Sequence, residues 1–93
     1  MRKKKFVIDA SLFTSKTQAH EVMKKEFRGF EYYGNNLDAL ADCLSELGKN
    51  SCVVLTNDDD MRKNLGSYAR RLISVIESTA AEYGFDFVIC GEE

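Results

Sequence analysis

The 93-residue sequence contains no proline and no tryptophan, and it has a single histidine. The absence of proline removes cis-proline isomerisation as a cause of slow folding. His20 has no obvious nucleophile beside it, so we expect it to cap or pack at the start of a helix rather than to act in catalysis. No glycine-rich phosphate loop of either common type occurs. These scarcities disfavour an enzyme and a nucleotide-binding protein.

Three cysteines, Cys43, Cys52 and Cys90, are an odd and sparse set that suits free thiols in the cytoplasm, where we expect the protein to be. Acids on the helix that carries Cys43 would raise the pKa of its thiol, so we expect a structural role for it. The cysteines lack C-x-x-C spacing, and residues 58–60 lack the alternating ligands and the glycine of a calcium loop. No metal and no other cofactor is therefore expected.

Long hydrophobic runs and a strong net charge are also missing. No stretch approaches the roughly 18 apolar residues of a membrane span, and only three apolar residues follow the basic start, which is too few for an export signal. The 13 Lys and Arg against 15 Asp and Glu argue against a dedicated nucleic-acid or membrane binder. The cations at 2–5 could contact phosphates weakly, but a solvated terminus that guards a sheet edge is the favoured interpretation.

The composition, 44% apolar and 30% charged, is that of a globular protein, and the length predicts one domain over residues 1–93. Apolar runs predict strands at 6–8, 51–56 and 85–90. The first is expected to be buried on both faces and the second to be covered by helices, because neither run alternates with polar residues.

Apolar stripes at helical spacing predict four helices between these strands. The first has Thr17 as its N-cap and ends near Gly29, and the second covers 37–47 after the cap Asn36. A short third helix follows candidate caps at 57–60 and ends at Gly66. The fourth covers 69–83. Residues 30–35 are expected to form an exposed loop. The order β-α-α-β-α-α-β predicts an α/β fold with a parallel sheet and right-handed connections.

Acidic residues follow the second predicted helix on the side away from its leucines. Asp38, Asp42 and Glu46 are four residues apart, so at about 100° per residue they form one ridge. Like charges at this spacing cost a few tenths of a kcal/mol, and the ridge is either a solvated face or a docking surface for a cationic partner. Tyr32 and Tyr33 precede it, and exposed tyrosines are enriched at interface hot spots.

The run at 31–44, Glu-Tyr-Tyr-Gly-Asn-Asn-Leu-Asp-Ala-Leu-Ala-Asp-Cys-Leu, closely resembles the signature of the barstar family of intracellular inhibitors of barnase-type ribonucleases. Weaker similarity at 20–26 and 84–89 extends the resemblance over the chain. It implies a barstar-like fold with a three-stranded parallel sheet and about four helices. It also implies a partner, a cognate ribonuclease or related nuclease toxin, whose active site is blocked by the acidic helix and the preceding Tyr-Tyr-Gly loop.

Residue roles are implied by the same resemblance: Asp42 as the central anchor, Asp38 as a second electrostatic contact, and the two tyrosines at the rim. The implied partner-binding residues are Tyr32, Tyr33, Gly34, Asn36, Asp38, Ala41, Asp42, Cys43, Glu46 and Glu77. No catalytic residue is expected. Direct binding to nucleic acid or to a membrane is not expected either.

Several positions depart from the family pattern. Ala41 and Leu47 stand where the best-known member has aromatic residues, and Asn35 replaces an acid in the loop. The acid expected on the last helix falls on Ser78 or on the neighbouring Glu77, depending on where a one-residue insertion is placed. These differences suggest a different cognate nuclease. A regulatory module that uses the same scaffold for a partner other than a nuclease is the alternative hypothesis.

Overall fold

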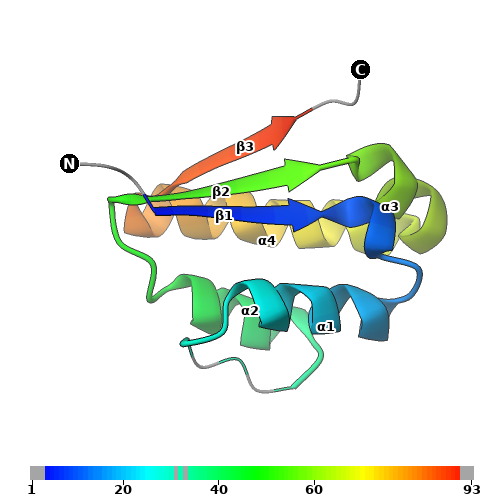
Figure 1. Cartoon of the computed structure of the whole chain (residues 1–93), viewed down its shortest axis with the longest axis horizontal. Helices are drawn as coiled ribbons and strands as arrows, with labels where there is room; N and C mark the ends of the chain where they lie inside the picture. Colours follow the sequence, from blue (N-terminus) through cyan, green and yellow to red (C-terminus); the bar gives the residue numbers. More distant parts are fainter. Residues whose placement is uncertain (1–3, 31, 33, 91–93) are drawn as a thin grey trace.

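A three-stranded parallel sheet forms one layer of the fold, and helices pack against one of its faces (Figure 1). The computed structural model describes residues 4–30, 32 and 34–90. The strands are β1 (Lys4–Asp9), β2 (Ser51–Thr56) and β3 (Asp86–Cys90), in the spatial order β1-β2-β3. The predicted order of elements and the parallel α/β class are confirmed.

Within the described ranges, four α-helices and one short 3-10 turn connect the strands. They are η1 (Ala10–Leu12), α1 (Lys16–Glu26), α2 (Leu37–Leu44), α3 (Asp58–Leu65) and α4 (Ser67–Tyr83). α1, α2 and α4 lie on one side of the sheet, whereas α3 lies beyond the carboxyl ends of β1 and β2 (Figure 1). In the part of the chain that the structure describes, no helix has the length and apolar character needed to cross a bilayer.

Side-chain caps set the start of two helices. The Ser15 hydroxyl accepts a hydrogen bond from the Gln18 N–H (3.1 Å), so α1 begins at Lys16 and the prediction of Thr17 as its cap is wrong. Asn36 caps α2 as predicted, because its side-chain oxygen accepts from the Ala39 N–H at 2.7 Å. The predicted end of this helix at residue 47 is wrong, since α2 ends at Leu44.

Within the residues that the structure describes, helices cover only one face of the sheet, which corrects the expectation that the first strand is buried on both faces. Phe6 and Val53 are paired in register and are both buried beneath the helices. The adjacent row on the other face contains Val7, Val54 and Val88, of which Val7 is 46% exposed and Val88 44% exposed. An unbroken apolar run predicts burial on both faces, but two packed layers leave the outer face of these strands in contact with water.

A polar cluster fixes the junction between β1 and α3. The Asp9 carboxylate accepts hydrogen bonds from the Ser11 N–H (3.0 Å), the Ser11 hydroxyl (2.7 Å) and the Asn57 side-chain amide (2.9 Å). The bond from Asn57 is the main cause that lowers the pKa of Asp9 below its usual 3.8. Asn57 itself is left-handed (φ 57°) and its side chain does not cap α3, so the expected cap at this residue is wrong.

Candidate protein-binding face

α2 has a buried inner side and an acidic outer side. Leu40, Cys43 and Leu44 are buried in the core, whereas Asp38 and Asp42 are exposed. Asp38 lies in the first turn, where the partial positive charge of the helix N-terminus favours a carboxylate. The two acids are four residues apart, so they share one face of the helix.

The third predicted acid, Glu46, is exposed but lies beyond the end of α2. The helix changes there into tighter turns, because the Glu46 N–H donates to the Cys43 carbonyl (3.1 Å) and the Leu47 N–H donates to the Leu44 carbonyl (3.0 Å). The Ser45 hydroxyl donates to the Asp42 carbonyl at 2.6 Å and stabilises this end. The expected continuous ridge is therefore two acids on the helix and a third on the turn that follows.

The segment before α2 is anchored by a buried hydrogen-bonded triad. Tyr32 is only 9% exposed and its hydroxyl lies 2.6 Å from Nδ1 of His20, whose Nε2 lies 2.7 Å from the hydroxyl of Tyr68. The expectation of an exposed loop is thus wrong for Tyr32, and Phe30 also packs against the core. Glu31 and Tyr33 lie outside the described residues. His20 was expected either to cap or to pack at the start of a helix. It packs in the core, but from the interior of α1 rather than from its start.

Burial changes the acid-base properties of this triad. It lowers the pKa of His20 below its usual 6.5, with the nearby Lys24 as a second cause. It also raises the pKa values of Tyr32 and Tyr68 above their usual 10.0. A neutral imidazole donates from one nitrogen and accepts at the other, so both tyrosine hydroxyls can be bonded to His20 with every member of the triad uncharged.

Gly34 and Asn36 shape the entry into α2. Gly34 has a φ of +86°, and a Cβ atom added there would lie 2.9 Å from the side-chain nitrogen of Asn36. Any other residue at position 34 would therefore strain the backbone and displace the side chain that caps the helix.

Cys43 and Ala41 differ in how far they reach the surface. Cys43 is fully buried, so its side chain cannot contact a partner that docks on the outer face of α2, whereas Ala41 is partly exposed. Burial raises the pKa of the Cys43 thiol to about 12, with the charge of Glu46 as the lesser cause. The expected structural role for this cysteine agrees with its position, although desolvation rather than the acidic helix dominates the pKa.

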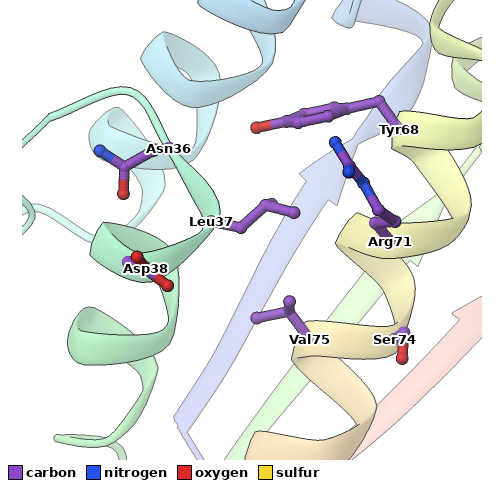
Figure 2. A pocket seen from close by; sticks show the side chains of 7 residues that line it. All are labelled: Asn36, Leu37, Asp38, Tyr68, Arg71, Ser74 and Val75. Carbon is purple, nitrogen blue, oxygen red and sulfur yellow. The ribbon is translucent and has the colours of Figure 1, made fainter.

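A groove of about 560 Å³ lies between the N-terminal part of α2 and α4. Its lining residues are Asn36, Leu37, Asp38, Tyr68, Arg71, Ser74 and Val75. Figure 2 shows Leu37 pointing from α2 toward α4, with Val75 and Arg71 on the facing helix. The groove therefore continues the acidic face of α2 onto a second helix.

The helical period of α4 decides which of its residues face the groove. Arg71, Ser74 and Ser78 are spaced i, i+3 and i+7 and share one side of the helix, whereas Glu77 points roughly 100° away from that side. Ser78 and Glu77 are both exposed, and the Ser78 hydroxyl donates to the Ser74 carbonyl at 2.8 Å. The charged residue that α4 contributes to the groove is thus Arg71, which the sequence reasoning missed although its spacing from Ser74 and Ser78 is visible in the sequence.

The one-sided sheet and the exposed helix beside a groove define a small α/β protein with a candidate protein-binding face. Among the described residues, no group of three or more His, Cys, Asp or Glu side chains is arranged to hold a metal ion. The sequence profile of the family Barstar (barnase inhibitor) matches residues 3–90. A protein of Bacillus subtilis (strain 168), named "Putative ribonuclease inhibitor YrdF", is 34% identical over 87 residues, which cover 92% of this chain and 96% of that protein. The chain belongs to the barstar family.

Proposed function

We infer that this protein inhibits a ribonuclease of the barnase type, or a related nuclease toxin, by docking α2 and the loop before it onto the active site of the nuclease. Both the family description and the name of the Bacillus subtilis relative support a ribonuclease inhibitor. The observation that carries the proposal is the exposed pair Asp38 and Asp42 on a helix whose start is fixed by Asn36.

Electrostatics favour such a partner. An active site that binds RNA phosphates is a positive cleft, so carboxylates on a preformed helix gain both association rate and affinity there. Among the residues that the structure describes, neither Asp38 nor Asp42 forms an ion pair, so both carboxylates are available to an incoming cation. Because the helix is already formed, little conformational entropy is lost on binding.

The proposed face has a contacting part and a supporting part. Asp42 is the central anchor, Asp38 and Glu46 are further electrostatic contacts, and Ala41 adds apolar contact between them. Gly34 and Asn36 hold the loop and the helix start, and Tyr33 is expected at the rim. The buried Tyr32 and Cys43 act from beneath by fixing the loop and the helix. Glu77 is exposed on α4 and is the proposed acidic contact from that helix, outside the groove. The protein acts by occlusion and needs no catalytic group or cofactor, and we place it in the cytoplasm.

The test is a titration of the wild-type protein and of Asp42→Ala into a barnase-type ribonuclease and into nuclease fractions from the source cells, with RNA hydrolysis as the readout. We expect Asp42→Ala to weaken inhibition by more than about 2 kcal/mol, the size of an interface hot spot, and such a hot spot is known at the corresponding acid of the barstar family. Its stability should stay nearly unchanged, because the side chain is exposed.

Asp59→Ala is the matched control. Asp59 is also an exposed aspartate, but it lies on α3, away from α2 (Figure 1). This variant should inhibit like the wild type. If the folded wild-type protein leaves every nuclease active, the proposal is wrong, and the face should be used as bait for a regulatory partner that is not a nuclease.

A further inference from the structure

The two walls of the groove between α2 and α4 carry opposite charges. Asp38 contributes a carboxylate from α2, and Arg71 contributes a guanidinium from α4 (Figure 2). Leu37 and Val75 supply apolar surface between them, and Ser74 adds a hydroxyl on the side of Arg71. The candidate binding face is therefore acidic along α2 but changes sign where it reaches α4.

Arg71 is held in place but is not neutralised. Its guanidinium lies 5.4 Å from the ring centroid of Tyr68, and the Lys16 amino group lies 4.8 Å from the same ring. Tyr68 is itself fixed by its bond to His20. No described carboxylate forms an ion pair with either cation, so the cation–π contacts orient the positive charge and leave its hydrogen-bond donors available.

A ligand for this groove must match both signs at once. An isolated phosphate or an RNA backbone carries only negative charge and would be repelled by Asp38. The surface of a protein can place a carboxylate opposite Arg71 and a cation opposite Asp38. A guanidinium binds a carboxylate through two parallel hydrogen bonds, which also favours Asp or Glu as the side chain that enters.

We propose that the partner nuclease inserts an acidic side chain into this groove against Arg71, next to the cations that meet Asp38 and Asp42. The inference rests on the proposed inhibitor function and extends it to partner choice. Arg71 acts as a specificity determinant, because it attracts a nuclease with an acid at this place and repels one with a cation there.

The experiment measures the dissociation constant of the complex with a nuclease that the wild-type protein inhibits, using Arg71→Glu and the matched control Arg70→Glu. Arg70 is exposed on the same helix, but it lines a different small pocket together with Arg62, Gly66 and Ser67. We expect Arg71→Glu to weaken binding at least tenfold and Arg70→Glu to change it less than threefold. Changing single exposed acids around the active site of the nuclease to Lys should, at one position, restore binding of Arg71→Glu, which identifies the paired acid.

Other outcomes overturn the inference. Equal effects of the two reversals would place the groove outside the interface, and tighter binding of Arg71→Glu would show that the partner brings a cation there. Arg71→Gln, which preserves much of the side chain without its charge, replaces Arg71→Glu if urea unfolding shows that the reversal destabilises the fold. Loss of inhibition in Asp42→Ala with full binding of both Arg71 variants would refute this inference alone. If the wild type inhibits no nuclease, the inhibitor proposal fails and this inference fails with it.

Discussion

His20 joins three parts of the molecule through its two ring nitrogens. It lies on α1, and it bonds Tyr32 in the loop before α2 and Tyr68 on α4, which also lines the groove. Buried polar groups of this kind are costly when a partner is removed, because the remaining donors and acceptors have lost water as well. One buried side chain thus holds both the loop and one wall of the candidate binding face.

The pH dependence of stability should report this triad. Burial lowers the pKa of His20 in the folded protein below 6.5, so the unfolded chain takes up a proton first as the pH falls. The stability contributed by neutral His20 is therefore fully present above about pH 6.5 and is lost between that value and the lower folded pKa. Urea unfolding of the wild type at a series of pH values across this window should show the decline.

His20→Gln provides the comparison. It should be less stable than the wild type by about 1–3 kcal/mol at neutral pH, because one or both tyrosine hydroxyls lose a buried partner. The difference between the two proteins should shrink as the pH falls, since the variant has no imidazole to titrate and the carboxylates are common to both. A difference that stays constant with pH would refute the lowered pKa.

For single residues, the sequence indicates which side chains are acidic or aromatic, but it does not indicate which of them come into contact in the fold. The exposed acids Asp38 and Asp42 follow from helical spacing alone. The triad could not be predicted, because His20 and Tyr68 are 48 positions apart and meet only after α1 packs beside α4. An aromatic segment without periodicity was expected to be exposed, yet Tyr32 is buried because its hydroxyl finds a partner inside.

Among the elements, the connection from β2 to α3 depends on Asn57 in two ways. Its backbone is left-handed, and its side chain donates to Asp9 at 2.9 Å. Asn57→Ala should lower the free energy of unfolding by about 2–3 kcal/mol, because alanine tolerates the left-handed conformation poorly and cannot form the hydrogen bond to Asp9. Asn57→Gly should lose only the bond, at about 1 kcal/mol, and urea unfolding of both variants measures the difference. Equal losses would show that the backbone conformation carries no cost.

The elements that could be predicted are those with a strong local signal. β2 has the predicted bounds, and α3 and α4 are separated at Gly66 as expected. The end of α2 was misjudged because Leu47, buried just beyond the last turn, continues the apolar stripe without continuing the helix. The one-sided sheet was also missed, since the sequence of a strand does not show how many layers cover it.

For the whole molecule, the placement of the layers separates the candidate binding face from the open face of the sheet. The inner side of α2 joins the same buried cluster as the strands, and its outer side is free for a partner. Val7 and Val88 belong to the row next to the buried pair Phe6 and Val53, so they lie on the uncovered face of the sheet. α2 lies on the side that the helices cover (Figure 1). A partner docked on the outer side of α2 would therefore leave the open face of the sheet uncovered.

A partner that docks on α2 meets a preformed helix only if α2 does not open independently of the core. Cys43 tests this, because its thiol is fully buried on the inner side of α2 and its pKa is raised to about 12. In a Cys52→Ala, Cys90→Ala variant it is the only thiol, and labelling by a thiol reagent requires an opening that exposes it. We expect the free energy of opening from the labelling rate to equal the free energy of unfolding from urea titration of the same variant. A clearly smaller value would mean that α2 opens locally, so that ordering this helix would oppose partner binding.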